Sequence, residues 1–393
     1  MKKHLLLPFL SLALISLNAC KKDDPTPEPQ PTPVYKPFEL TKNGTSEIGE
    51  LCVAYYPWAT ITDSTYLMVL DGDGNVLKSK TEVVCCTDFK RWTINGENYY
   101  SYLRHNPQHY RIPGAGYVNG DIVILDNNMN EVKTIQLLPH NGRGASDPVS
   151  LGGHEFILID LNHYIVQAYY KKEVSNVPAS LNPYNNINVV DCIIQEVNNG
   201  SVVMEWDAAS DSLNYLGYYA PSEFSDSTIT VDFAHLNSIS IDPTDQNLLV
   251  SFRNLDQVMK INRTTGAIMW RLGGTYSDFQ LSANQVFLRQ HYASRNSEGN
   301  IMLFDNGDLN LRAQSRVVEF GLDETNKTVT TFKSMDVPDN VFGRYMGSVQ
   351  KVNGRYIVGC GSVGRIFEMD ATTGEVYRDF KSTKVSYRAQ NFN

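Results

Sequence analysis

The sequence lacks an apolar run long enough to cross a bilayer, an excess of basic residues and a cysteine spacing typical of a zinc site. Its first apolar stretch, residues 5–17, is shorter than the ~20 residues of a transmembrane helix. The net charge of −9 argues against binding to a nucleic-acid backbone. Beyond Cys20 there are five cysteines, an odd number, so at least one is unpaired within the chain.

Long amphipathic helical periodicity is scarce as well. Short runs of β-branched and aromatic residues dominate instead, separated by Asn-Gly, Thr-Gly and Asp-Gly pairs. Such runs divided by turn dipeptides are typical of β-strands joined by tight turns. The sequence therefore predicts an all-β fold.

The N-terminus has the pattern of an exported, lipid-anchored protein. Lys2 and Lys3 precede the apolar stretch, which ends in Leu17-Asn18-Ala19-Cys20. This pattern resembles the lipobox of bacterial lipoproteins, in which the cysteine thiol is diacylated. Residues 1–19 are then a signal peptide; the alternative is an ordinary secretory signal in which Cys20 is incidental.

The residues after Cys20 suggest where the protein resides. Lys21-Lys22-Asp23-Asp24 resembles an export signal for surface display in some Gram-negative bacteria, although a solvated charge run is the simpler alternative. Six prolines between residues 24 and 37 keep this segment extended. We expect residues 20–37 to tether an outer-membrane lipoprotein that is exposed on the cell surface or, failing that, periplasmic.

One hairpin pattern recurs through the remaining chain: an apolar strand, an acidic or amide-rich turn, then Val or Ile opening a second strand. Examples are residues 67–76 (LMVLDGDGNV) and 367–376 (FEMDATTGEV). The expected turns are at Asp73, Asn128, Asn199, Thr265, Asn326 and Thr373. The spacing is loose, but the pattern occurs six times.

A second pattern precedes several of these hairpins. His154 and His291 are each followed nine residues later by a polar residue and three apolar ones, and His235 by a similar strand after a longer loop. Each unit thus holds an inner and an outer strand pair, which predicts a six-bladed β-propeller of four-stranded antiparallel blades over residues 38–393. Residues 38–60 are expected to form a short N-terminal β segment. Two stacked sandwiches are the less favoured alternative.

The repeat assigns three histidines to one structural position. His154, His235 and His291 each begin the innermost strand of a unit, so rotation about the axis brings them to one mouth of the channel. Arg253 ends the strand antiparallel to that of His235 and returns to the same mouth. Asn237 is two residues after His235, which places it on the same side of the strand.

Two kinds of site fit this set of side chains. Three imidazoles can hold Zn²⁺ with one position open. His and Arg together can instead bind an oxyanion. Arg253 favours the anion site, because a guanidinium repels a cation and binds an oxyanion through two parallel hydrogen bonds.

Two long stretches carry a family resemblance. Residues 233–274 (FAHLNSISIDPTDQNLLVSFRNLDQVMKINRTTGAIMWRLGG) and 289–307 (RQHYASRNSEGNIMLFDNG) resemble bacterial aryl-sulfate sulfotransferases, and the similarity runs from about residue 63 to the C-terminus. The resemblance implies a six-bladed propeller that moves a sulfuryl group from a phenolic sulfate ester to a phenolic acceptor, without a nucleotide donor. It implies no metal or organic cofactor.

The resemblance also suggests roles for individual residues. The family nucleophile corresponds to His291, and the motif residues that assist it correspond to His154, His235, Asn237 and Arg253. The acid that commonly follows the nucleophile is replaced here by Tyr292. This departure keeps open a non-enzymatic surface propeller that binds a sulfated or anionic ligand. A metal-dependent lactonase-type propeller would need acidic ligands at the axis, and the matched positions supply none.

The lipobox-like ending gives the first testable prediction. Cys20→Ala removes the acylated thiol, so the variant should appear as soluble protein or as uncleaved precursor. Fractionation and mass spectrometry of the mature N-terminus would measure this. Mature wild-type protein without acyl chains would contradict the assignment.

Overall fold

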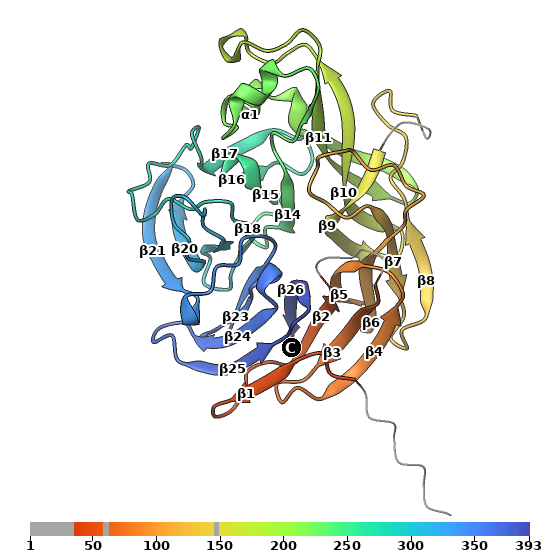
Figure 1. The fold of residues 1–393 in the computed structure, drawn as a ribbon, viewed down its shortest axis with the longest axis vertical. Coiled ribbons are helices and arrows are strands. Elements are labelled where there is room, and N and C mark those ends of the chain that lie inside the picture. The colour runs from red at the N-terminus through yellow and green to blue at the C-terminus, as the bar shows by residue number, and fades with distance from the viewer. Residues whose placement is uncertain (1–34, 58–62, 145–148) are drawn as a thin grey trace, which may run out of the picture. The chain divides into compact units, whose positions relative to one another are not determined.

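Six small antiparallel sheets arranged as a ring make up the structure (Figure 1). It is a computed structural model that describes residues 35–57, 63–144 and 149–393. The fold described below is that of the unit Lys36–Asn393. The expected signal peptide, Cys20 and the tether up to residue 34 lie outside the described residues, as do residues 58–60 of the expected N-terminal β segment.

Each sheet is built on four antiparallel strands from the centre of the ring outwards, which confirms the predicted six-bladed propeller; two sheets carry one additional short strand. The first three blades are β26 (Val385–Phe392), β2 (Glu50–Tyr56), β3 (Thr65–Leu70) and β4 (Val76–Glu82); β5 (Cys86–Ile94), β6 (Glu97–His105), β7 (Gly120–Leu125) and β8 (Glu131–Ile135); and β9 (Val149–Asp160), β10 (His163–Val174), β11 (Ile187–Asn198) and β12 (Ser201–Asp207). A two-residue strand, β13 (Thr230–Val231), pairs in parallel with β11.

The other three blades follow in chain order. They are β14 (Leu236–Ile241), β15 (Leu248–Phe252), β16 (Gln257–Ile261) and β17 (Ile268–Gly273); β18 (His291–Arg295), β19 (Ile301–Asp305), β20 (Arg316–Asp323) and β21 (Thr328–Asp336); and β22 (Ser348–Val352), β23 (Arg355–Gly359), β24 (Arg365–Asp370) and β25 (Val376–Lys381). The short β1 (Glu39–Lys42) extends the last blade by pairing with β25.

Helical structure is confined to the connections. The α-helix α1 (Ser212–Leu216) lies in the connection between the third and fourth blades, where the side chain of Asp211 caps its N-terminus. The 3-10 turns are η1 (Ala179–Leu181), η2 (Ala208–Ser210), η3 (Pro221–Ser225), η4 (Arg253–Leu255), η5 (Pro338–Asn340) and η6 (Gly361–Val363). No helix among the described residues is both long and apolar enough to cross a membrane.

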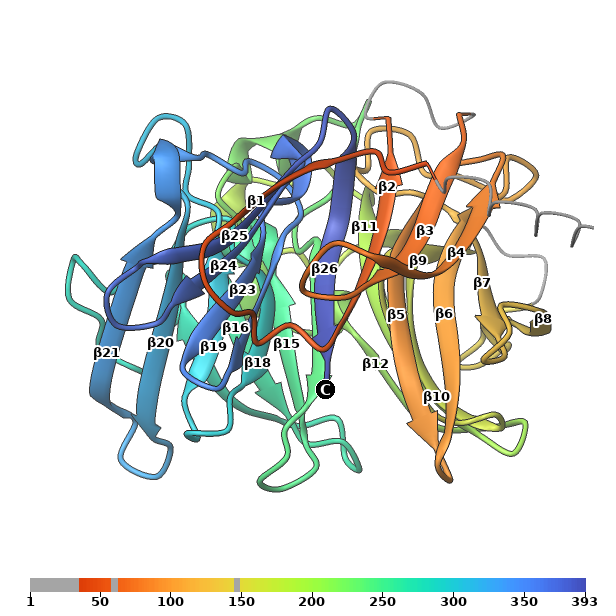
Figure 2. The ribbon, with the colours of Figure 1, turned by 90° about the horizontal axis from the view of Figure 1, so that it is seen from below.

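The two ends of the described chain close the ring together. The C-terminal β26 is the inner strand of the blade whose other three strands lie near the N-terminus, and Val53 pairs with Ala389 across that junction. Figure 2 shows β26 standing beside β2. The segment predicted as a short N-terminal β element is thus divided between two blades, with β1 on the last and β2 in the first.

The outer hairpins turn where the sequence predicts. Asp71 Oδ1 accepts hydrogen bonds from the backbone N–H groups of Asp73 (2.9 Å) and Asn75 (2.8 Å). Asp370 Oδ1 likewise accepts from the backbone N–H groups of Thr372 and Thr373. A short carboxylate or amide side chain that accepts from the backbone two residues on stabilises a tight turn. This is the physical reason for the acidic and amide-rich turns of the repeat.

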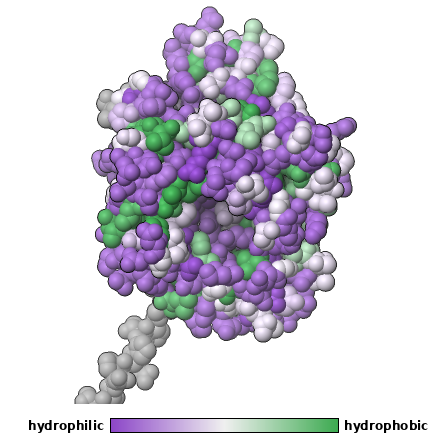
Figure 3. Space-filling view, turned by 180° about the vertical axis from the view of Figure 1, so that it is seen from behind, coloured by the Kyte–Doolittle hydropathy of each residue, from purple (hydrophilic) through white to green (hydrophobic). Residues whose placement is uncertain are grey.

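The core lies between neighbouring blades rather than at the centre of the ring. Along β2, Leu51 and Val53 pack with the last blade, whereas Cys52 and Ala54 pack with the second. Successive side chains of a strand point to opposite faces, so a blade between two neighbours buries both. β2 is therefore buried on both faces and almost continuously apolar. Seen from behind, the ring has a hollow near its centre and a mainly hydrophilic face (Figure 3).

Candidate active site

A cavity of about 730 Å³ is formed by the connections at one side of the ring. These connections either enter an inner strand from the preceding blade or join the second and third strands of a blade, and in a propeller both kinds emerge on the same face. His154, His235, His291 and Arg253 all line the cavity. The structure therefore brings together four of the five polar residues singled out in the sequence.

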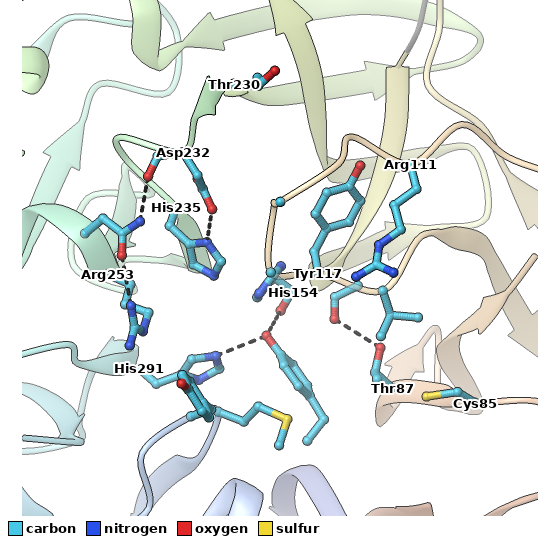
Figure 4. Close-up of a pocket in the computed structure, with 18 of the residues that line it drawn as sticks. Cys85, Thr87, Arg111, Tyr117, His154, Thr230, Asp232, His235, Arg253 and His291 are labelled. Carbon is cyan, nitrogen blue, oxygen red and sulfur yellow. Dashed lines mark hydrogen bonds and ion pairs between the residues drawn. The ribbon is translucent and has the colours of Figure 1, made fainter. Parts of the chain in front are cut away.

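The three imidazoles face a common space (Figure 4). The ring centroids of His154 and His235 are 5.0 Å apart, and those of His154 and His291 are 6.5 Å apart. All three side chains are buried. Within the described residues, no group of three or more His, Cys, Asp or Glu side chains is arranged to hold a metal ion.

The hydrogen bonds of His291 define its tautomer. Its Nδ1 lies 2.6 Å from the carbonyl oxygen of Gly347, which can only accept, so Nδ1 carries the hydrogen. Nε2 of the neutral ring then holds a lone pair. Burial lowers the pKa of His291 well below 6.5, and the nearby positive charge of Arg388 lowers it further. His291 is consequently a neutral imidazole at neutral pH.

Tyr387 is a site residue that the sequence analysis missed. It comes from β26, and its hydroxyl lies 3.1 Å from His291 Nε2 and 3.2 Å from the carbonyl oxygen of His154. A tyrosine has one hydroxyl hydrogen, so it donates to one of these two acceptors at a time. The repeat could not locate Tyr387, because its blade is assembled from opposite ends of the chain.

His235 has a carboxylate partner that was also missed. Its Nδ1 lies 2.7 Å from Asp232 Oδ2, and the Asp232 backbone oxygen accepts a hydrogen bond from Asn254. The backbone of His235 has φ of 53°, the left-handed region that non-glycine residues rarely adopt. Strain of this kind gathers at functional sites, where the surroundings maintain it. Here it orients the ring between Asp232 and the cavity.

His154 is held by a neighbouring tyrosine. The Tyr169 hydroxyl donates to the carbonyl of Leu236 at 2.7 Å, so its oxygen accepts from His154 Nδ1, which is 3.0 Å away. Burial is the main cause that lowers the pKa of His154 well below 6.5, and the neighbouring His235 and His291 lower it further. His154 is thus a second neutral imidazole with its Nε2 unprotonated.

Arg253 begins η4, immediately after β15. Its guanidinium donates to Asn254 Oδ1 at 2.9 Å and lies 5.5 Å from the ring centroid of Tyr345. Burial and the nearby Arg289 lower its pKa, but a guanidinium still remains charged at neutral pH. Among the described residues no carboxylate forms an ion pair with it. Its charge is therefore free to meet an anion in the cavity.

Asn237 does not line the cavity, unlike the other four predicted residues. It is fully buried. Its side-chain nitrogen donates to the Gln290 backbone carbonyl at 2.7 Å, and its backbone carbonyl accepts from Arg388. The pairing register of β14 shifts between Leu236 and Ser238. Such a bulge breaks the alternation that placed Asn237 beside His235. Asn237 instead supports the backbone just before His291.

Beneath the histidines lies a buried cluster of four charges. Arg388 donates to Asp88 (2.9 Å) and Glu155 (2.8 Å), and Lys90 forms ion pairs with the same two carboxylates. The Arg388 guanidinium also lies 4.9 Å from the ring centroid of Tyr292. Burial raises the pKa of Asp88, whereas Arg388 and Lys90 outweigh burial and lower the pKa of Glu155. The acid expected after His291 is thus replaced by an aromatic ring over this cluster.

A comparison with protein families identifies the chain. The family model for arylsulfotransferases matches residues 106–381, about two thirds of the sequence.

The chain belongs to the arylsulfotransferase family.

This membership supports sulfotransferase activity in general terms. No curated protein matches the chain. Among solved structures, the periplasmic gluconolactonase of Pseudomonas aeruginosa is 12% identical with a TM-score of 0.48, covering 88% of this chain and 99% of that one. A Bacteroides caccae protein of unknown function is 12% identical with a TM-score of 0.44, covering 86% and 97%. At these scores neither bears on the activity of this arylsulfotransferase.

The lowered pKa values of the two buried imidazoles predict a pH-dependent stability. Below pH 6.5 the unfolded chain takes up protons that folded His154 and His291 do not, so the free energy of unfolding falls as the pH drops from 7.5 to 5. His291→Asn keeps an N–H group for the Gly347 carbonyl and removes one titrating site. Denaturant titrations should show that this variant loses less stability over that interval, by up to about 2 kcal/mol.

The same titrations contain their own control. Well above pH 6.5 neither imidazole makes the free energy of unfolding depend on pH. The free energies of unfolding of the variant and the wild type should therefore change in parallel between pH 7.5 and 8.5. Parallel behaviour below pH 6.5 as well would show that folded His291 takes up protons like an unfolded histidine.

Proposed function

We propose that this chain transfers a sulfuryl group from a phenolic sulfate ester to a phenolic acceptor, without a nucleotide donor, through a sulfohistidine at His291. The observation that carries the proposal is the state of His291. Gly347 occupies Nδ1, which leaves the Nε2 lone pair available on a neutral ring in the cavity. A neutral imidazole is both a nucleophile and a leaving group, as a carrier between two oxygens must be.

In the first half-reaction, Nε2 attacks sulfur and the bond between sulfur and the aryl oxygen breaks. The electron pair leaves with the phenolate. Positive charge develops on the imidazole ring, and the hydrogen bond from Nδ1 to the Gly347 carbonyl stabilises it. Arg253 meets the negative charge on the sulfuryl oxygens from the same cavity wall, and no carboxylate of the described residues forms an ion pair with it.

Proton transfer falls to His235. The Asp232 carboxylate holds its Nδ1–H, so that Nε2 faces the cavity and can carry a second proton. This proton passes to the departing phenolate, and in the second half-reaction the acceptor phenol returns one to the same nitrogen. The acceptor oxygen then attacks sulfur, the N–S bond breaks, and its electron pair returns to His291 Nε2.

Tyr387 keeps the nucleophile in position between these steps. In the resting site its hydroxyl can donate to His291 Nε2, and when Nε2 bonds to sulfur the hydroxyl can turn to the His154 carbonyl or to a sulfuryl oxygen. The second acceptor lets the hydroxyl release Nε2 without losing a hydrogen bond.

We also propose that Cys20 anchors the enzyme to the outer membrane.

The covalent intermediate gives the central prediction. An aryl sulfate without acceptor should release one equivalent of phenol in a burst and add the mass of one SO₃ group to the protein, with peptide mapping placing it on His291. His291→Ala should show neither. His235→Ala should retain a slow version of both, because it removes only proton transfer. With acceptor present, double-reciprocal plots should be parallel.

These outcomes separate the proposal from its alternative. Full turnover by His291→Ala, or a stable adduct on another residue, would show that the nucleophile is wrong. Tight binding of aryl sulfates with no burst from any donor would instead identify a non-enzymatic propeller that binds sulfated or anionic ligands.

A second prediction concerns Arg253. Arg253→Lys keeps the charge but loses the planar pair of donors, so kcat should fall by about 100-fold. Arg344 is a matched control: its guanidinium lies 5.1 Å from the same Tyr345 ring, but it does not line the cavity. Arg344→Lys should therefore keep near-wild-type turnover. If Arg253→Lys does so too, Arg253 has only a structural role.

A further inference from the structure

Arg111 lines the cavity but takes no part in the transfer described above. It lies in the connection between β6 and β7, and Figure 4 shows it across the cavity from Arg253 and His291. Its backbone position is fixed, because the N–H of the next residue, Ile112, donates to the Tyr117 hydroxyl at 3.0 Å. The Tyr117 ring in turn packs 4.6 Å from that of Tyr169.

The ion pairs of the chain distinguish Arg111 from most other arginines. All 16 arginines lie in the described residues, and 13 of them form ion pairs with Asp or Glu. The three without an Asp or Glu partner among the described residues are Arg111, Arg253 and Arg344. Two of these three line the cavity. The fold thus leaves unpaired positive charge facing this space.

The acidic side chains of the cavity do not neutralise Arg111. Asp232 pairs with His235 at 2.7 Å, and Glu223 accepts a hydrogen bond from the Tyr218 hydroxyl at 2.7 Å. If Arg253 receives the sulfuryl group, a second anionic group on the substrate is the natural partner of Arg111.

The size and walls of the cavity indicate what separates the two anions. In a ping-pong reaction the donor and the acceptor occupy the cavity in turn, so its volume is that of one substrate. About 730 Å³ is in the range of pockets that enclose drug-sized ligands, which is more than one aromatic ring fills. Tyrosine side chains line much of the wall and offer faces for stacking. These are Tyr56, Tyr117, Tyr218, Tyr219, Tyr345 and Tyr387.

We infer that the preferred substrates are multi-ring phenols, and their sulfate esters, that carry a second anionic group bound by Arg111 at the end remote from the reacting oxygen. This inference rests on the proposed function, since it takes His291 and Arg253 as the reacting end. The shared chemistry is a carboxylate or a second sulfate, either of which a guanidinium can bind with two donors.

The test compares two acceptors that differ by one charge. With 4-nitrophenyl sulfate as donor at pH 8, 4-hydroxybiphenyl and 4′-hydroxybiphenyl-4-carboxylate are each titrated. Arg111→Met should raise the KM for the carboxylate about tenfold and leave that for 4-hydroxybiphenyl unchanged. Arg344→Met, which removes an unpaired arginine outside the cavity, should change neither. For the single-ring acceptor 4-hydroxybenzoate, Arg111→Met should raise KM less than it does for the biphenyl carboxylate, because 4-hydroxybenzoate is too short to span the cavity.

A binding measurement keeps the inference testable apart from turnover. His291→Ala is titrated with 4-hydroxybiphenyl sulfate, with its 4′-carboxylate and with the biphenyl bis-sulfate, with and without Arg111→Met. The added carboxylate or second sulfate should tighten binding only when Arg111 is present. Whichever of the two tightens binding more identifies the anionic group that Arg111 prefers. An unchanged preference in Arg111→Met would overturn the inference, whereas absence of a burst in the wild type would overturn the proposed function.

Discussion

The pairing of the last strand with the first blade is the constraint on which the rest of the structure depends. β26 closes the ring beside β2, and residues 385–393 sit at the centre of the molecule rather than at its edge. The same strand delivers Tyr387 to His291 and Arg388 to the buried charges below it. The strand that closes the ring therefore also completes the site, since a propeller without β26 would lack both Tyr387 and Arg388.

Arg388 connects this closure to the chemistry. Its guanidinium is buried. One terminal nitrogen donates to Asp88 and Glu155 and the other to the Asn237 carbonyl, while Nε has no hydrogen-bond partner among the described residues. A buried charge is tolerated only when it is paired and hydrogen-bonded in this way. The positive charge that remains near the histidines disfavours their protonation, which is the second cause of the lowered pKa of His291. The site thereby keeps His291, the proposed nucleophile, neutral without an acid next to it, and the Tyr292 ring lies over the cluster instead.

The cavity is then defined by what the fold leaves unpaired. Within the described residues, 13 of the 16 arginines form ion pairs with carboxylates, and two of the three exceptions, Arg111 and Arg253, line the cavity. Arg253 lies near His235 and His291, and Arg111 lies across the cavity beside Tyr117 (Figure 4). A long, aromatic, doubly anionic ligand satisfies both cations at once, which links the proposed transfer to the proposed substrate class.

The sequence by itself determined the features that repeat. The six hairpins, their turns and the common place of His154, His235 and His291 follow from local turn chemistry and from rotation of one unit about an axis. Tertiary structure alone decided what does not repeat. Asn237 points away from the cavity because the register shift in β14 interrupts strand alternation. Tyr387 meets His291 across 96 residues, and Arg388 meets Asp88 across 300, through ring closure. A period read along the chain records neighbours within a unit, whereas these contacts arise only when ring closure places β26 beside strands of other blades.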